Sequence, residues 1–194
     1  MTPPDSDPIE EPADVPGRSS PMARLARVIG QAARFPGDAY GLGTGEHAAL
    51  ERMNPEAMCP HQVAALSRAL IQAELEPEHW KPATWRRWAL IAHGMALAGH
   101  NGKGTLGKQL CNAEVAENRI TKLLTARGDA FRQLIPPLLR LLASKQVAPN
   151  WHELGNLILN EGNSETAAQD KAEDIRMKIA GRYFSALAKS KTKS

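Results

Sequence analysis

Apolar side chains recur at steps of three and four residues along most of the chain, and no stretch of useful length alternates between apolar and polar positions. Steps of three and four place side chains on one face of an α-helix, whereas alternation is typical of a β-strand. We therefore predict an all-α protein, a compact multi-helix bundle. The clearest stripe lies near the C-terminus, at Ala168, Ala172, Ile175, Ile179, Tyr183 and Leu187.

Prolines and glycines divide this pattern into separate helices. Pro60 and Pro82 are each expected in the first turn of a helix, where a missing N–H costs nothing, and Gly99 is expected to end the second of these helices. Further helices are predicted from Met22 to the Pro36–Gly37 pair and over residues 46–53, 105–112 and 115–126.

The last third of the chain carries two kinds of boundary signal. An apolar segment over 129–145 contains Pro136–Pro137, which predicts a kink or a restart as two helices. Asn150, with Glu153 three residues on, resembles a capping pair that opens a helix through Leu159, and Ser164 is the predicted N-cap of the final helix.

The two ends of the chain differ from the middle in composition. Residues 1–21 hold six prolines and carry a net charge of −4, so they lack the apolar surface needed to offset the entropy of ordering. We predict a disordered acidic tail over 1–21, a helical domain over 22–188 and a basic C-terminal tail over 189–194. Joints at Pro77–Pro82 and Gly155–Ser164 leave a division into two helical subdomains open.

Composition narrows the class of protein. Two cysteines without paired spacing do not make a disulfide framework, and this agrees with a reducing compartment. No run approaches the roughly 18 apolar residues of a membrane span, and the acidic N-terminus does not resemble a secretion signal. We expect a cytoplasmic protein that does not enter a membrane.

The sequence contains no recognisable catalytic motif. Cys59 and His61 are close together, but zinc sites usually show two closely spaced ligand pairs. The glycines at 41, 43 and 45 follow no predicted strand, so a nucleotide-binding loop is not indicated. His93 lies close to the Trp-rich helix stripe and is interpreted as a packed or surface histidine. We predict no catalytic activity, no metal, no cofactor and no small-molecule substrate.

Basic residues are concentrated in two segments. Residues 103–147 carry eight Lys and Arg against three acids, and the region from Lys171 to the C-terminus has the same net charge of +5. Arg119 and Lys122 would be neighbours on one side of a helix, with Lys103 and Lys108 just before it. This spacing permits a phosphate-binding patch. A set of solvated cations that flank the core is the alternative.

The same region also permits a helix-turn-helix. Leu106–Leu110, then a turn, then a helix from Val115 fit that motif. Glu114 and Glu117 would stand at the start of the second helix, where they repel phosphates. A transcriptional regulator therefore remains an alternative function, as does a structural adaptor without DNA affinity.

Several short segments, taken in order, resemble the CasB family, the small subunit of the type I-E CRISPR Cascade complex. The resemblance covers about residues 22–187. The segments that carry it are Gly43–Arg52, Trp85–Trp88, Leu106–Leu110, Glu117–Leu124, Leu138–Leu142 and Asn150–Trp151.

The resemblance implies a non-catalytic helical subunit of a crRNA-guided complex. It implies two copies that bridge the backbone and large subunits and help to hold the target and displaced strands of crRNA-bound DNA. Basic positions of the family pattern match Arg52, Lys108, Arg119 and Arg140, while His47 stands where the pattern has Arg. Local charge adds further candidate nucleic-acid contacts at Lys103, Lys122 and Arg127.

Overall fold

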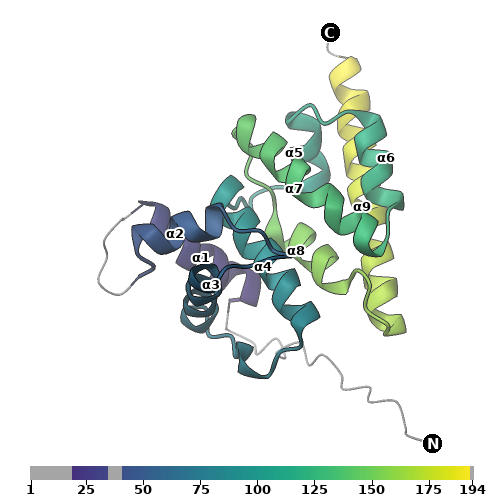
Figure 1. The fold of residues 1–194 in the computed structure, drawn as a ribbon. Coiled ribbons are helices and arrows are strands. Elements are labelled where there is room, and N and C mark those ends of the chain that lie inside the picture. The colour runs from purple at the N-terminus through teal and green to yellow at the C-terminus, as the bar shows by residue number, and fades with distance from the viewer. Residues whose placement is uncertain (1–18, 35–40, 193–194) are drawn as a thin grey trace, which may run out of the picture.

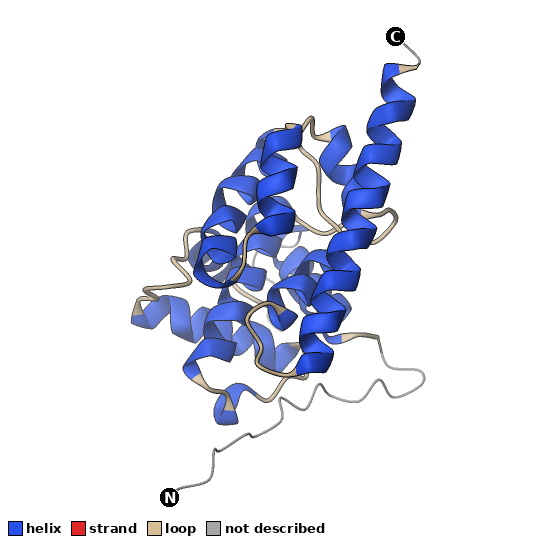
Figure 2. Ribbon diagram, turned by 90° about the vertical axis from the view of Figure 1, so that its right-hand side faces the viewer, coloured by secondary structure: helices blue, strands red, loops and turns tan. Residues whose placement is uncertain are grey.

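A computed structural model describes residues 19–34 and 41–192, and every regular element in these ranges is a helix (Figure 2). The all-α prediction is therefore confirmed. Residues 1–18 of the tail predicted over 1–21 lie outside the described residues. The elements are α1 (Pro21–Arg34), α2 (Thr44–Glu51), α3 (Pro60–Gln72), the short 3₁₀ helix η1 (Pro77–His79), α4 (Pro82–Ala98), α5 (Leu106–Asn112), α6 (Glu117–Thr125), α7 (Gly128–Ser144), α8 (Trp151–Asn160) and α9 (Thr166–Lys191).

Helix α4 lies at the centre of the bundle (Figure 1). It is buried on all sides from Arg87 to Met95, and it packs against α1 and α2 as well as α7 and α8. Buried apolar residues from α1 to α9 form one continuous cluster. The described helices therefore share one core, and the alternative of two separate subdomains is not seen.

Most predicted helix starts are correct. Pro60 and Pro82 both lie in first turns. Asn150 is the N-cap of α8, where its side chain accepts a hydrogen bond from the His152 N–H at 2.9 Å. Ser164 is not the N-cap of α9: that residue is Glu165, whose own N–H donates to the Asn163 side chain at 3.1 Å.

Glu153 does not pair with Asn150 to cap its own helix. Its carboxylate accepts a hydrogen bond from the Leu106 N–H at 2.9 Å, at the start of α5, and also binds Arg182 of α9. The expected capping pair is therefore wrong in its second member. The carboxylate satisfies an orphan N–H of another helix instead, and so ties α8 to α5 and α9.

Helix α7 runs without interruption through Pro136 and Pro137, so the alternative of a restart as two helices is wrong. Each proline deprives the carbonyl four residues earlier of its donor, and those carbonyls belong to Arg132 and Gln133. Arg132 is half-buried and Gln133 is exposed, so water can solvate the region. Burial of Ile135, Leu138, Leu139 and Leu142 holds both halves of the helix against the core.

The boundaries at the two ends also differ slightly from the predicted ones. The first helix includes Pro21, and the hydroxyl of Ser20 accepts a hydrogen bond from the Ala23 N–H at 3.3 Å. Helix α9 continues past residue 188 to Lys191, whose ammonium lies 3.4 Å from the Glu117 carboxylate of α6. The predicted stripe of α9 faces the core, with Ala168, Ala172, Ile179 and Tyr183 buried.

Candidate nucleic-acid interface

Helices α5 and α6 and the turn between them carry the centre of the predicted basic surface. Leu106 and Leu110 of α5, and Ile120 and Leu123 of α6, are buried in the core. Because these apolar residues face inward, the side chains between them point outward. Lys108, Arg119 and Lys122 are exposed, as is Lys103 in the preceding loop.

A buried tyrosine holds this helix pair against α9. The Tyr183 hydroxyl donates a hydrogen bond to the Val115 carbonyl in the α5–α6 turn, and burial raises the pKa of this phenol above its ordinary value. Gly107 of α5 packs so closely on α9 that a Cβ there would lie 2.5 Å from the Ile179 carbonyl oxygen. The backbone under the basic residues is therefore fixed by tertiary contacts.

Six of the seven predicted site residues are exposed and form no ion pair with any residue in the described part of the chain. An unpaired surface cation keeps its full charge for an outside anion. The six are Arg52, Lys103, Lys108, Arg119, Lys122 and Arg140.

Arg127, the seventh predicted residue, has a different environment. Its guanidinium lies 2.8 Å from Glu173 of α9 and donates to the carbonyls of Leu124 and Ala126 at 2.8 and 3.0 Å. These contacts connect the end of α6 with α9. Arg127 is thus part of a structural network as well as an exposed cation.

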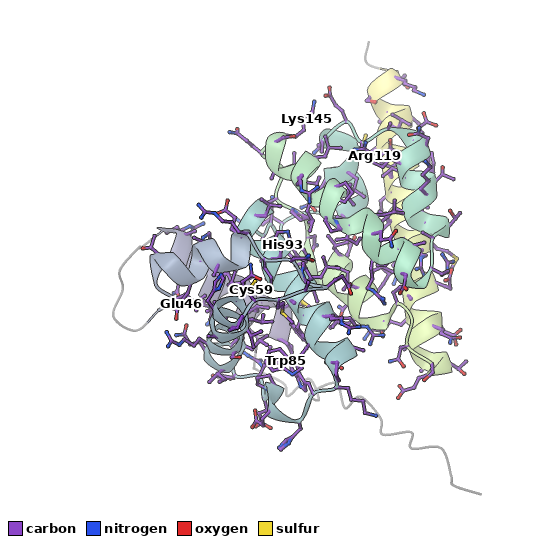
Figure 3. The ribbon with its side chains drawn as sticks, in the orientation of Figure 1. Glu46, Cys59, Trp85, His93, Arg119 and Lys145 are labelled. Atoms are coloured by element: carbon purple, nitrogen blue, oxygen red, sulfur yellow. The ribbon has the colours of Figure 1, made fainter. Side chains whose placement is uncertain are left out.

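The seven residues fall into two groups by element. The first group comes from the consecutive stretch between the loop before α5 and the residue that caps α7, and it comprises Lys103, Lys108, Arg119, Lys122 and Arg127. The other two are Arg52, the C-cap of α2, and Arg140 on α7. In Figure 3, Arg119 lies at the end of the molecule that also carries Lys145, and Trp85 lies at the opposite end.

The acids beside α6 are already engaged. Glu114 lies 2.5 Å from Lys145, which holds the pKa of this carboxyl below its ordinary value. Glu117 faces Lys191. Both carboxylates are exposed, so these pairs are weak. Glu114 and Glu117 lie at the N-terminal end of α6, which would be the second helix of a helix-turn-helix.

A groove of about 410 Å³ runs along the outer side of α7. Arg132 lies within it and pairs with Glu56 at 3.4 Å and with Asp129. The groove is therefore lined both by the cation Arg132 and by the two acids, Glu56 and Asp129, that pair with it. Its other lining residues are Asn54, Pro55, Leu90, Gln133, Pro136, Pro137 and Arg140.

His93 is packed in the core, which is one of the two environments predicted for it from the sequence. Its Nδ1 donates to the Leu50 carbonyl at 3.1 Å, and burial, reinforced by repulsion from Arg140, lowers the pKa of the imidazole. Cys59 is exposed and Cys111 half-buried. Within residues 19–34 and 41–192, no three His, Cys, Asp or Glu side chains are grouped to hold a metal ion.

Two buried arginines were not predicted as functional or structural features. Arg176 lies on the apolar stripe of α9 between Ala172 and Ile179. A charged residue at a position expected to be buried was the one feature of the sequence that could have indicated a buried ion pair. Arg87 lies beside Trp88 on the central helix. The sequence could not assign the main partner of Arg176, because Glu161 lies at the end of another helix.

This all-helical architecture, with exposed cations on a short helix pair, agrees with the resemblance seen in the sequence. A scan against family models matches residues 46–184 to the family described as CRISPR-associated protein Cse2. The match spans more than half of the chain and includes all seven predicted site residues. The chain belongs to this family, the small subunit of type I-E Cascade.

Two further comparisons add nothing to this assignment. A search of curated proteins and a search of solved structures each found no significant match. Among the helices of the described ranges, none is long and apolar enough to cross a membrane.

Proposed function

We propose that this subunit binds nucleic acid without catalysing a reaction, and that it stabilises the target and displaced DNA strands within Cascade in the cytoplasm. It would bridge the backbone and large subunits and act beside a second copy of itself. The observation that supports this proposal most strongly is the set of exposed, unpaired cations on α5 and α6 in a chain of the Cse2 family.

The chemistry of these cations favours phosphates as ligands. Lys108, Arg119 and Lys122 can each approach a phosphate without first breaking an internal ion pair. Neutralising a phosphate releases condensed counterions, which favours binding and makes it depend on salt. Such contacts read no bases, so the predicted binding is independent of sequence.

A sequence-specific regulator is the second candidate function. The turn Ala113–Ala116 joins two short helices, which is the arrangement of a helix-turn-helix. Recognition helices present their N-terminal residues to base edges, and here that end carries Glu114 and Glu117. Backbone binding agrees better with this charge distribution.

The decisive experiment replaces Lys108 and Arg119 by Ala in the assembled complex. We expect affinity to fall by a similar factor for unrelated target sequences. The salt dependence should flatten by about 0.7 to 0.9 per lost contact in log–log units. The matched control is Arg68→Ala with Lys178→Ala, which removes the same charge from exposed residues already paired with Glu46 and Asp174.

Each alternative predicts its own result. If the Lys108 and Arg119 variant keeps both its affinity and its salt dependence, these cations are only solvated and the subunit acts as an adaptor. If binding is lost for one short duplex and retained for others, the helix-turn-helix function is correct. Equal losses in the variant and the control would indicate a general effect of net charge.

A further inference from the structure

Two buried arginines lie near the same carboxylate, Glu161, at the end of α8. Arg176 binds Glu161 directly, lies 2.8 Å from Glu173, and donates to the Ala126 carbonyl at 3.4 Å. Its guanidinium also stacks 5.6 Å from the centre of the Phe131 ring. Both terminal nitrogens of the buried Arg176 therefore have partners, although its Nε has none among the described residues.

Arg87 of α4 has no comparable set. It is only 9% exposed, yet it donates no hydrogen bond to any residue of the described ranges and has no carboxylate oxygen there within ion-pair distance. The Glu161 oxygens are taken by Arg176 and by the Gly128 N–H at 2.7 Å. Glu161 therefore attracts Arg87 only from a longer range.

The surroundings of Arg87 disfavour its charge. Burial lowers the pKa of the guanidinium, the nearby Arg132 lowers it further, and only Glu161 opposes them. Trp88 and Leu90 show that this part of α4 accommodates apolar side chains. A largely buried cation with a like-charged neighbour and no acceptor from the protein is unfavourable for the fold, and such conflicts are typical of binding sites.

The guanidinium of Arg87 is open to the surface at its tip. Its nitrogens are not among the fully buried polar atoms that lack a partner. One terminal nitrogen lies 3.9 Å from where a Cβ would stand at Gly162, in the turn after α8. Because glycine has no side chain, nothing from that position covers the tip.

We infer that Arg87 and Arg132 form an oxyanion site between α4, α7 and the turn after α8, and that it takes a phosphate of the nucleic-acid backbone. This inference rests on the proposed function and adds a contact away from α5 and α6. A phosphate would supply acceptors for the Arg87 donors, which have no acceptor in the described part of the chain and are open to solvent, and would lie between two like charges. Guanidinium groups are suited to this because their planar donors match two phosphate oxygens at once.

The acids near the site do not prevent this binding. Glu56 and Asp129, which pair with Arg132, have side chains that are 54% and 80% exposed. Exposed pairs of this kind are weak and can rearrange at little cost. A phosphate that approaches Arg87 therefore competes with solvated carboxylates and displaces no buried partner.

The test uses Arg87→Gln, with Arg176→Gln as the comparison. In the assembled complex, Arg87→Gln should weaken DNA binding several-fold and flatten the salt dependence by about 0.7 to 0.9 in log–log units. In the isolated full chain, its melting temperature should stay the same or rise, because a strained charge is removed. Inorganic phosphate, compared with chloride at equal ionic strength, should raise the melting temperature of the wild type more than that of the variant.

Three outcomes would overturn the site. Arg87→Gln could lower the melting temperature as much as Arg176→Gln, which would make Arg87 a structural residue. The Arg87→Gln variant could keep its melting temperature and also show unchanged DNA affinity and salt dependence, which would mean that Arg87 contacts no phosphate. It could instead release another Cascade subunit without changing DNA affinity, which would indicate a protein carboxylate as the ligand.

The Lys108 and Arg119 variant separates this inference from the proposed function. If that variant loses affinity and Arg87→Gln does not, only the Arg87 site is wrong. If neither variant loses affinity, the proposed function fails as well.

Discussion

Two segments with the same net charge of +5 have different surroundings in the folded chain. On α9, the cations Arg176, Lys178, Arg182 and Lys191 all pair with carboxylates of α9 itself or of neighbouring elements. In the segment 103–147, Lys103, Lys108, Arg119, Lys122 and Arg140 have no such partner among the described residues. The comparison shows that net charge does not locate a binding surface, because the distribution of carboxylates decides which cations are free.

The difference follows from where each segment lies. Helix α9 packs along α5 and α8 and also touches α6. It therefore meets Glu117, Glu153 and Glu161, which those helices or their ends present. The outer faces of α5 and α6 are turned away from these contacts. The named cations of α9 are engaged in contacts within the fold, whereas those on α5 and α6 remain available to an outside anion.

The largest expected effect on stability comes from removing a carboxylate that pairs with a cation of α9. Replacing Glu161 by Ala leaves Arg176 buried without its main partner and removes the acceptor of the Gly128 N–H. We expect the free energy of unfolding to fall by about 3 to 5 kcal/mol, measured by urea denaturation with circular dichroism. Glu165→Ala, at an exposed position nearby, should change it by less than about 0.5 kcal/mol. A similar small change for Glu161→Ala would contradict a structural role for the pair.

The next effect concerns the contact that joins the two segments. Gly107→Ala would place a methyl group 2.5 Å from the Ile179 carbonyl oxygen, and backbone cannot move aside easily. We expect a loss of about 1 to 3 kcal/mol. Gly181→Ala is the matched control, because nothing lies within 4 Å of a Cβ there, and it should stabilise α9 by about 0.5 to 1 kcal/mol. Equal effects at both positions would contradict the close packing of α5 on α9.

A smaller effect is expected from pH, through His93. Its pKa is lowered in the folded chain, so the folded state binds fewer protons than the unfolded state below the ordinary pKa of about 6.5. Stability should therefore be complete above that value and fall as the pH drops below it. Urea midpoints at about pH 7.5 and pH 5.5 measure the change.

Two substitutions separate the contribution of His93 to this pH dependence. His93→Gln should reduce it without abolishing it, since the pKa of His100 is lowered by burial too. Arg140→Ala should also reduce it, because Arg140 repels the protonated imidazole. An unchanged pH dependence in both variants would show that another group is responsible.

The smallest effects on stability are expected when one cation from each of the two segments is removed. Lys108→Ala removes an unpaired cation, and Lys178→Ala removes one that lies 2.5 Å from Asp174 on an exposed helix face. Both should change the free energy of unfolding by less than about 0.5 kcal/mol. Only Lys108→Ala should weaken DNA binding by the assembled complex. A larger effect of Lys178→Ala on binding would place the interface on α9.

Local patterns predicted the helices well and their partners poorly. The stripe of α9, the first-turn prolines at 60 and 82, and the cap at Asn150 depend on residues close together in the chain. Glu153 has a side chain suited to capping, but the N–H that it reaches belongs to Leu106. The spacing of Asn150 and Glu153 correctly indicated that the Glu153 carboxylate accepts a helix-capping hydrogen bond, but it could not show that the donor belongs to α5.

The candidate site shows the same division. Local charge predicted cations over 103–147, and the family match includes all of them. Arg127 was grouped with the others, yet in the folded chain it contacts Glu173 of α9. No local signal reveals this contact, because Glu173 lies 46 residues further along the chain.

The sequence by itself determined that this chain is helical, where most helices begin and end, and which family it belongs to. These properties depend on backbone propensity, periodic burial and ordered motifs, all of which are local or read in chain order. Only the tertiary structure decided which charges are paired, that Arg176 binds Glu161, and that Arg87 has no such partner among the described residues. Ion pairs and burial depend on the distances between side chains from separate helices, and these distances exist only after the helices have packed on one core.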